Sequence, residues 1–269
     1  MKLVRVQPLL LPTPSPHSAS HVAPAASFGQ LDEDTIWELR GPFEGERQRT
    51  GRSWPLTQVR LLPPIVPSKV VCQGRNYREH ALELKNPVPT EPLIFMKPPS
   101  SIIGPEEPVL IPAISKRVDY EGEIAAVIGR PCGRLRDADD VAPYVLGYTC
   151  LNDVTARDLQ MLDKHFTRAK GFDTFCPLGP LIETEFNLAA ASVSTFLNGE
   201  RRQFGRTTEM IFSVDVIIRW VSRIMTLAPG DVVATGTPAG VGPLAPGDLV
   251  EVEVSGIGRL RNPVAPRGD

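Results

Sequence analysis

Cysteine is scarce in this sequence. The chain has four cysteines among 269 residues, and no two of them stand at the C-x-x-C spacing of a metal finger or a redox pair. The spacing argues against a cysteine-based metal site and against a disulfide framework. We expect reduced and mostly buried thiols, as is typical of a cytoplasmic protein, at all four positions: Cys72, Cys132, Cys150 and Cys176.

No charge of one sign dominates, and long apolar runs are missing. The 29 Lys and Arg residues nearly balance the 31 Asp and Glu residues, which gives a net charge of −2 and a pI near 6.1. Because the basic residues are scattered, we expect neither nucleic acid nor an anionic membrane surface as a partner. The first residues contain no sustained apolar stretch, and no run could span a bilayer, so we expect no signal peptide and no membrane segment.

Proline, in contrast, is abundant. The chain has 28 prolines, but 42% of its residues are hydrophobic, which predicts rigid loops around a sizeable core rather than disorder. Residues 12–27 are rich in Pro, Ser and Ala and are predicted to form an exposed loop. The segment at 62–67 contains three prolines, which cannot continue a helix or a central strand. We therefore place a boundary there, between an N-terminal subdomain at 1–66 and a main domain at 67–269.

Short apolar runs between turn signals predict a β-rich α+β chain with few helices. We expect an opening strand within residues 1–11 and short strands or turns over residues 28–62. In the main domain, strands are predicted at 69–74, 124–129, 145–151, 231–234 and 249–254. Helices are predicted at 75–84, at 155–160 and at about 210–226, the last with apolar residues at three- and four-residue spacings.

The stretch at residues 119–123, Asp-Tyr-Glu-Gly-Glu, is the most informative about function. In a strand, residues i, i+2 and i+4 share a face, so Asp119, Glu121 and Glu123 are expected to converge. Asp153 follows a second buried strand. Crowded carboxylates need compensation, and a hard divalent cation such as Mg²⁺ or Mn²⁺ prefers oxygen ligands. The alternative is that Glu121 and Glu123 are solvated charges on an edge strand.

Two further groups of polar residues could carry chemistry. Glu83 follows His80 by three positions on a predicted helix, so its carboxylate would orient the imidazole as a general base. Arg157 and Gln160 share a helix face in the same way, and together with Lys170 they could bind a carboxylate or an oxyanion. Taken alone, each group also fits an ordinary solvated surface.

Together these segments resemble the fumarylacetoacetate hydrolase family, in family order over about residues 69–263. The segments that carry the resemblance are Gly74-Arg75-Asn76-Tyr77-x-x-His80, Phe95-Met96-Lys97-Pro98-Pro99-Ser100-Ser101, Asp119-Tyr120-Glu121-Gly122-Glu123, Asn152-Asp153-x-Thr155-Ala156-Arg157-Asp158-x-Gln160, Lys170-Gly171-Phe172-Asp173, Leu197-Asn198-Gly199-Glu200 and Gly230-Asp231-x-x-x-Thr235-Gly236-Thr237-Pro238-x-Gly240-Val241-Gly242. Residues 1–68 carry no comparable signal and correspond to a variable N-terminal part.

The resemblance implies a β-sandwich roll with a few short helices. It also implies a homodimer that binds Mg²⁺ or Mn²⁺, with Ca²⁺ as a further possibility. Carried over position by position, Glu121, Glu123 and Asp153 correspond to the metal ligands. Asp119 is expected to orient a ligand or Lys170 rather than to bind the metal directly.

The remaining roles also follow from the resemblance. His80 with Glu83 corresponds to the acid/base pair, and Lys170 to the residue that stabilises an oxyanion. Three residues correspond to substrate or oxyanion contacts: Arg157, Gln160 and Thr237.

The predicted substrate is a small 2-oxo acid, and the predicted activity is that of a metal-dependent enzyme. The first hypothesis is a hydrolase that cleaves a C–C bond of β-diketo or 2-oxo acids, such as acylpyruvates or fumarylpyruvate, through a metal-stabilised enolate. The alternative is an isomerase or decarboxylase of muconate-type 2-oxo diacids in aromatic catabolism. A third hypothesis, a catalytically inert binding relative, is disfavoured because the carboxylates and His80 are all present.

Overall fold

The computed structural model describes residues 1–9 and 25–268, so most of the predicted loop at 12–27 lies outside the described residues. Strands dominate in the described residues, as the sequence predicts, and the four α-helices found there are short. The elements are β1 (Lys2–Pro8), β2 (Ser27–Asp32), β3 (Thr35–Leu39), β4 (Arg49–Pro55), β5 (Val59–Leu62), β6 (Val70–Gly74), α1 (Arg78–Glu83), β7 (Leu93–Lys97), β8 (Ile102–Ile103), β9 (Val109–Ile111), β10 (Val118–Tyr120), β11 (Gly122–Ile128), β12 (Val145–Asn152), β13 (Thr155–Ala156), α2 (Arg157–Asp163), α3 (Thr167–Lys170), β14 (Cys176–Glu183), β15 (Ser192–Leu197), β16 (Glu200–Arg206), α4 (Val214–Ile224), β17 (Val232–Ala234), β18 (Gly242–Pro243), β19 (Leu249–Val254) and β20 (Gly258–Pro266).

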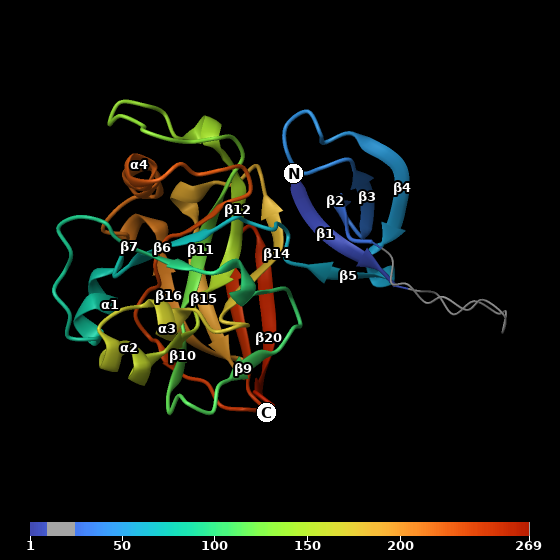
Figure 1. Cartoon of the computed structure of the whole chain (residues 1–269). Coiled ribbons are helices and arrows are strands. Elements are labelled where there is room, and N and C mark those ends of the chain that lie inside the picture. Colours follow the sequence, from blue (N-terminus) through green and yellow to red (C-terminus); the bar gives the residue numbers. More distant parts are fainter. Residues whose placement is uncertain (10–24, 269) are drawn as a thin grey trace.

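The largest sheet in the described part of the chain has twelve strands and extends from the N-terminal strands into the main body. Its main order is β4-β3-β2-β1-β14-β12-β11-β17-β6-β7, with β5 paired to β1 and β8 paired to β14. The N-terminal strands lie to the right in Figure 1, and they join the main body where β1 pairs with β14. Residues 63–69, which include the predicted boundary, contain no helix or strand.

A second sheet packs on the first and makes the main body a sandwich. It has the order β16-β15-β19-β20-β9. Ile124 and Cys150 from the large sheet share a buried cluster with Val193 and Val252 from the second sheet. Burial of such a cluster is the main favourable term that holds the layers together.

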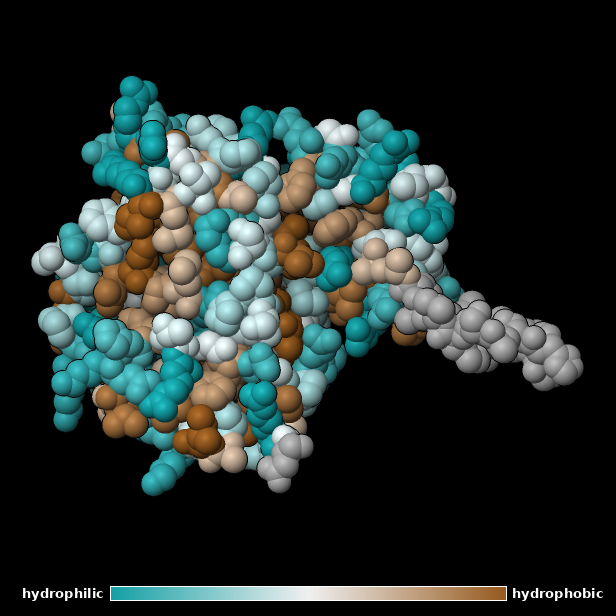
Figure 2. Space-filling view, viewed as in Figure 1, coloured by the Kyte–Doolittle hydropathy of each residue, from teal (hydrophilic) through white to brown (hydrophobic). Residues whose placement is uncertain are grey.

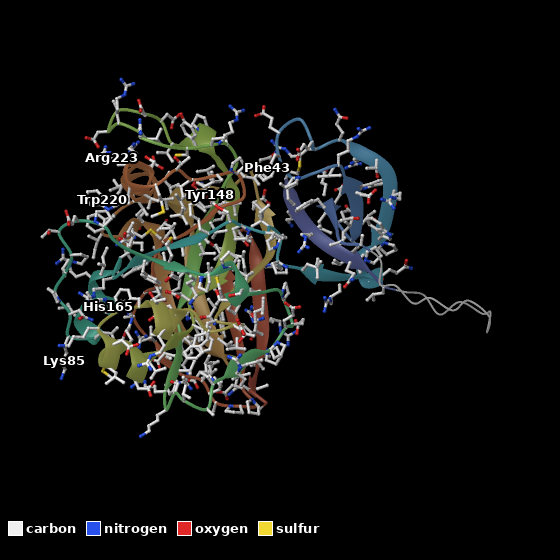
Figure 3. The ribbon with its side chains drawn as sticks, in the orientation of Figure 1. Phe43, Lys85, Tyr148, His165, Trp220 and Arg223 are labelled. Atoms are coloured by element: carbon white, nitrogen blue, oxygen red, sulfur yellow. The ribbon has the colours of Figure 1, made fainter. Side chains whose placement is uncertain are left out.

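Helix α4 covers another part of the same face. Its apolar side Ile217, Ile218 and Val221 packs on Ala126 and Val233 of the large sheet. Figure 3 shows Trp220 and Arg223 on this helix and Phe43 near the junction with the N-terminal strands. The odd-numbered residues of β11 face the opposite side of the sheet, and this parity decides where the acidic residues point.

All three predicted helices begin later than the sequence pattern indicates. The helix predicted over 155–160 is α2, which begins at Arg157 because Thr155 and Ala156 pair with β10 as strand β13. The helix predicted over 210–226 is α4, which begins after Ser213 because the Ser213 side chain accepts a hydrogen bond from the first turn. The helix predicted over 75–84 is α1, which begins only at Arg78. Arg75 has a φ of 56° and lies in the left-handed region, which a helix cannot contain.

The state of the thiols and the polarity of the surface agree with the expectations from the sequence. All four cysteines are free and buried. Figure 2 shows hydrophilic residues over much of the visible face, with hydrophobic residues in small groups between them. Among the described residues, no helix is long and apolar enough to cross a membrane.

Candidate active site

The acidic residues meet because β11 begins where the antiparallel β12 ends. In this register, Gly122 lies opposite Asn152. The Glu121 amide donates a hydrogen bond of 2.9 Å to Oδ1 of Asn152, and the Asp153 amide donates one of 2.8 Å to the Glu121 carbonyl. The sheet therefore places the side chains of Glu121 and Glu123 beside that of Asp153.

Glu121, Glu123 and Asp153 form a buried group, here called the carboxylate triad. Their oxygens lie within 4.8 Å of one another, and the residues are only 4%, 2% and 1% exposed. The burial excludes the alternative of solvated charges on an edge strand. Gly122 allows the second sheet to pack behind the triad, because a Cβ atom there would lie 2.0 Å from Oγ1 of Thr195.

Three buried cations contact the triad. Nζ of Lys170 donates to Glu121 at 2.7 Å and to Asp153 at 2.5 Å. Nζ of Lys97 donates to Asp153 at 2.6 Å, and Nη2 of Arg157 donates to Glu121 at 2.5 Å. These three side chains therefore neutralise much of the negative charge of the triad, which the sequence analysis expected a metal ion to neutralise.

Lys97 is a buried residue at the site that sequence reasoning missed. It lies in one of the segments that carry the family resemblance, but no role was predicted for it. The sequence feature that could have identified it is its position as a lysine at the end of the apolar strand β7. In the structure this lysine is 1% exposed. A fully buried lysine requires an anionic partner, and the partner here is Asp153.

The triad remains short of positive charge at Glu123. Burial, followed by the charges of Asp153 and Glu121, raises the pKa of Glu123 well above its ordinary value. Burial acts in the same direction on Glu121, but Lys170 and Arg157 outweigh it and hold the pKa of Glu121 below the ordinary value. Three clustered oxygen donors with one uncompensated carboxylate fit a hard divalent cation such as Mg²⁺, Mn²⁺ or Ca²⁺.

Asp119 does not join the triad, so the expected convergence of three carboxylates is wrong. It lies on β10, which belongs to a separate three-stranded sheet, and Glu121 lies between the end of β10 and the start of β11. The Asp119 carboxylate accepts hydrogen bonds from Arg117 at 2.9 and 3.2 Å and from Nε of Arg157 at 3.0 Å. It thus orients Arg157, and no bond to Lys170 is present.

Helix α2 brings Arg157 and Gln160 together, as their spacing predicts. Nη1 of Arg157 donates to Oε1 of Gln160 at 2.8 Å. With the bonds to Asp119 and Glu121, three of the five N–H groups of Arg157 are bonded to the protein, and two remain for a ligand. The amide nitrogen of Gln160 also remains available as a donor.

His80 is buried on α1 and is oriented by Glu83. Its Nδ1 atom lies 3.4 Å from Oε2 of Glu83, and Glu83 also accepts hydrogen bonds of 3.1 and 3.2 Å from the Gly240 amide. Burial raises the pKa of Glu83, but the hydrogen bonds from His80 and Gly240 outweigh it and leave the pKa below its ordinary value. His165 is exposed, in contrast, and lies near the surface in Figure 3.

Thr237 is held by its neighbours rather than free. Its hydroxyl donates to the Gly122 carbonyl at 2.9 Å and accepts from Nε2 of Gln203 at 2.8 Å. The hydroxyl can therefore only accept from a ligand. The Thr237 amide has no hydrogen-bond partner among the described residues and is the donor that it could offer to an anion.

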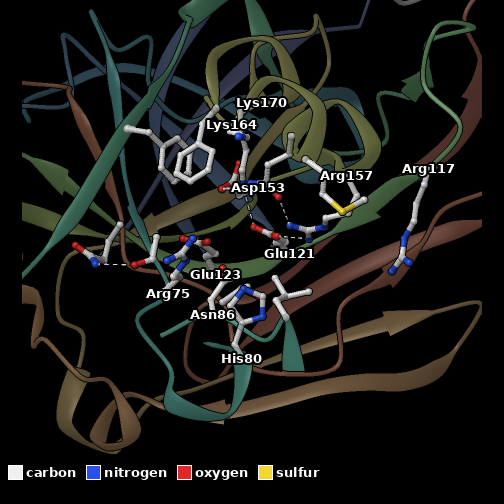
Figure 4. A pocket seen from close by; sticks show the side chains of 18 residues that line it. Arg75, His80, Asn86, Arg117, Glu121, Glu123, Asp153, Arg157, Lys164 and Lys170 are labelled. Carbon is white, nitrogen blue, oxygen red and sulfur yellow. Dashed lines mark hydrogen bonds and ion pairs between the residues drawn. The ribbon is translucent and has the colours of Figure 1, made fainter. Parts of the chain in front are cut away.

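These groups surround one cavity of about 470 Å³, a size typical of small-molecule sites. Figure 4 shows the triad, His80, Arg157 and Lys170 directed toward it. Every predicted site residue lines the cavity except Glu83, which supports His80 from behind. The lining residues that were not predicted as site residues include Arg75, Asn86, Phe95, Arg117, Met161, Lys164 and Phe166.

The sequence matches the family described as fumarylacetoacetate (FAA) hydrolase, C-terminal, over residues 69–265. This chain belongs to the fumarylacetoacetate hydrolase family. A second match, to the family described as Rv2993c-like, N-terminal, covers residues 22–64. The resemblance inferred from the motifs is therefore confirmed, and so is the β-rich fold with an additional N-terminal part.

Similar members of the family carry different names. Protein Rv2993c of Mycobacterium tuberculosis is 47% identical over 257 residues, which cover 94% of this chain and 97% of that protein. The crystal structure of a 5-carboxymethyl-2-hydroxymuconate delta-isomerase from Mycobacterium smegmatis has a TM-score of 0.87 and 43% identity, and covers 99% of this chain and 100% of that one. The mitochondrial oxaloacetate tautomerase fahd2 of Xenopus laevis is 39% identical over 250 residues, which cover 88% of this chain and 77% of that protein.

Proposed function

We propose that this member of the fumarylacetoacetate hydrolase family is an enzyme that catalyses metal-assisted isomerisation of 2-oxo acids. In such a reaction a proton moves to or from the carbon next to the 2-oxo group. The observation that carries the proposal is the carboxylate triad, which faces the same cavity as His80. The names of the two relatives described as an isomerase and a tautomerase support this reaction over C–C hydrolysis, our first hypothesis from the sequence.

Glu121, Glu123 and Asp153 would hold the metal ion, with Mg²⁺ or Mn²⁺ as the first candidates and Ca²⁺ as a further one. A divalent cation bound there supplies stabilisation of the negative charge that develops at the 2-oxo oxygen. The raised pKa of Glu123 supports a cation at this position, because a nearby positive charge favours the ionised carboxylate.

The protein's own residues would position the substrate and move the proton. Glu83 holds Nδ1 of His80, so Nε2 is the ring nitrogen that exchanges a proton with the substrate carbon. The two unused N–H groups of Arg157 and the amide of Gln160 would bind the substrate carboxylate. Lys170 uses two of its three N–H groups on the triad and can direct the third at a developing oxyanion.

Hydrolysis of acylpyruvates is the second candidate. The observation that favours it is the oriented and buried His80, which could take a proton from water as readily as from carbon. Decarboxylation of a 2-oxo diacid needs the same stabilised charge at the 2-oxo oxygen.

The test is an assay of the purified full chain with each type of substrate. We expect accelerated decay of the enol absorbance of oxaloacetate or a 2-hydroxymuconate in the presence of Mg²⁺, with the acceleration lost in EDTA and in Glu121→Gln. Undiminished activity after chelation would contradict the role of the metal. Faster release of pyruvate from an acylpyruvate than isomerisation of either enol would favour the hydrolase instead.

We also propose that the chain acts as a cytoplasmic homodimer with a variable subdomain at 1–66 and a catalytic domain at 67–269. The four free, buried thiols support a reducing compartment. The division near residue 66 is supported by the two family matches: the N-terminal match ends at residue 64 and the second begins at residue 69.

Light scattering tests the dimer and should give about twice the chain mass of 29.4 kDa. A mass equal to one chain would contradict the dimer.

A further inference from the structure

Gln203 is a buried glutamine next to the carboxylate triad that the proposed mechanism does not use. It lies on β16 of the second sheet and is 1% exposed. Oε1 of Gln203 accepts a hydrogen bond of 3.0 Å from the Gly122 amide. Nε2 donates to Oγ1 of Thr237 at 2.8 Å and to the Pro238 carbonyl at 2.7 Å. Both N–H groups and the oxygen of this side-chain amide are therefore used on residues of the site.

Gly122 is the point at which Gln203 acts on the triad. It lies between Glu121 and Glu123, two of the three proposed metal ligands. Its amide donates to Gln203, and its carbonyl accepts from the Thr237 hydroxyl at 2.9 Å. Gln203, Gly122 and Thr237 thus form a closed ring of hydrogen bonds. The ring fixes both of the peptide groups that join Gly122 to the two glutamates.

The loop between β17 and β18 forms the other side of the same ring. Gln203 bonds to two residues in the middle of this loop. On one side of them, the Gly236 amide donates to Oε2 of Glu123 at 2.7 Å. On the other side, the Gly240 amide donates to Glu83 at 3.1 and 3.2 Å. The loop thus contacts both a proposed metal ligand and the carboxylate that orients the proposed base, and Gln203 holds it between these two contacts.

A β-bulge directs Gln203 toward the site. In the pairing of β15 with β16, Phe196 lies opposite Arg201. Its neighbour Thr195 lies opposite Gln203, which leaves Arg202 as an extra residue. Because side chains alternate along a strand, an unbroken pairing would place Arg202 opposite Thr195, in the buried position. With the bulge, Arg202 is exposed and the neutral amide of Gln203 faces the start of β11. Bulges next to active sites commonly redirect a side chain in this way.

The turn before the bulge is one of the segments that carry the family resemblance, and no role was predicted for it. Leu197 and Glu200 pair across this turn, and Asn198 and Gly199 between them have φ angles of 53° and 81°. Two central residues with positive φ form the tight hairpin turn that fits the twist of paired strands. The turn therefore sets the register from which the bulge directs Gln203 inward.

We propose that Gln203 is a positioning residue that holds Glu123 and Glu83 in one arrangement, so that metal binding at the triad and the orientation of His80 depend on each other. The inference rests on the proposed function, in which the triad holds a divalent cation and His80 moves the proton. Gln203 does not line the cavity and acts through Gly122 and the loop between β17 and β18. Residues that orient metal ligands in this way typically contribute about 10- to 100-fold in metal affinity.

Calorimetric titration of the metal-free full chain with Mg²⁺ tests the effect on metal binding. We expect Gln203→Met, which removes the amide and keeps a side chain of similar length, to weaken Mg²⁺ binding by about 10-fold or more. Asn262→Leu is the matched control. Asn262 is also 1% exposed and donates to the carbonyls of Gly104 and Glu107 at 2.9 and 2.8 Å, but it lies on β20 outside the cavity. This control should lower the stability in urea and leave the Mg²⁺ affinity unchanged.

Amide hydrogen exchange in the wild-type protein, followed by NMR, tests the coupling without a substitution. Mg²⁺ should slow exchange at the Gly236 amide, which bonds to the triad. It should also slow exchange at the Gly240 amide, which bonds to Glu83 and to no proposed metal ligand. The control is the Ala245 amide, which donates to the Asp248 carboxylate at 2.8 Å and should exchange at the same rate with and without Mg²⁺.

A Mg²⁺ affinity in Gln203→Met equal to that of the wild type, or an equal loss in Asn262→Leu, would overturn the inference. If Gln203→Met does not fold, the exchange measurement decides, and an unchanged rate at Gly240 would overturn it. Glu121→Gln separates these results from the proposed function. If the wild type binds Mg²⁺ and Glu121→Gln does not, either result defeats only the role of Gln203. If the wild type does not bind Mg²⁺, or if binding ignores Glu121, the proposed function fails as well.

Discussion

Nζ of Lys97 lies 2.6 Å from Oδ1 of Asp153, and the two side chains are 0% and 1% exposed. Lys97 also donates to the Val154 carbonyl at 3.0 Å, while the second oxygen of Asp153 accepts from Lys170. Both oxygens of Asp153 are thus oriented by cations from other elements. Lys97 is a positioning residue for a proposed metal ligand, because it acts on the site through Asp153.

We expect Lys97→Met to destabilise the protein. The substitution leaves Asp153 with one buried cation instead of two, and removal of one partner from a buried ion pair typically costs about 3 kcal/mol or more. Urea unfolding should show this loss in the free energy of unfolding. Lys116→Met, at an exposed lysine with no side-chain bond among the described residues, should change it by less than about 0.5 kcal/mol. Equal stability of Lys97→Met and wild type would show that Asp153 does not need this pair.

We expect Glu123→Gln to unfold at the same temperature as the wild type or higher when EDTA is present. A raised pKa means that the folded state disfavours the ionised carboxylate, so wild-type stability falls as the pH rises through the folded pKa, and a neutral amide removes this cost. Saturating Mg²⁺ should stabilise the wild type by about 2–3 kcal/mol and leave Glu123→Gln unchanged. Thermal unfolding in both buffers measures the difference.

Glu91→Gln is the control for this experiment, since Glu91 is exposed and has no side-chain partner among the described residues. It should keep the full response to Mg²⁺. A response to Mg²⁺ of the same size in Glu123→Gln would contradict the assignment of Glu123 as a metal ligand.

We expect His80→Asn to lower kcat by about 100-fold or more, with a smaller change in KM, because general acid–base catalysis typically contributes this much. Glu83→Gln should have a weaker effect, since it only orients the ring. The direct measurement is exchange of the proton at carbon 3 of the substrate in D₂O, followed by NMR. Glu79→Gln, an exposed change on the same helix, should leave exchange intact. Exchange at the wild-type rate in His80→Asn would remove His80 as the base.

We expect Asp231 to contribute stability that depends on pH. Its buried carboxylate accepts from the Ser68 hydroxyl at 2.6 Å and from Nζ of Lys69 at 2.5 Å. Burial raises the pKa of Asp231, but the hydrogen bonds from Lys69 and Ser68 outweigh it and lower the pKa. A lowered folded pKa gives stability that is fully present above the unfolded value of about 4 and is lost as the pH falls through the folded value.

The corresponding variant is Asp231→Asn. At pH 7 it should be about 2 kcal/mol less stable than the wild type, and the difference should shrink as the pH drops below about 4. Asp34→Asn, at an exposed aspartate, is the control and should follow the wild type at every pH. If the difference in the free energy of unfolding stays constant from neutral to acidic pH, the charge of Asp231 is not the source of this stability.

The strands that the sequence predicted carry a local apolar pattern, whereas others, such as β14, β15, β16 and β20, were not predicted. Runs such as β11 and β12 are mostly apolar and almost entirely buried, since both faces of the central sheet are covered. The residues at which α1 and α4 begin were not predictable, because they depend on the conformations of single residues, Arg75 and Ser213. Periodicity also failed at Asp119, where the chain leaves one sheet for another and an unbroken i, i+2, i+4 face does not exist.

The sequence alone determined the acidic motif and the family, because these depend on residue types at short, fixed spacings. Only the tertiary structure decided which charges meet. Lys97 and Asp153 are 56 residues apart, and no local pattern links them. The register of β11 on β12 and the position of β7 in the same sheet, separated from β11 by β17 and β6, bring the pair together. The physical reason is that a buried charge is tolerated only with a partner, and the folded sheet, not the neighbouring residues, supplies it.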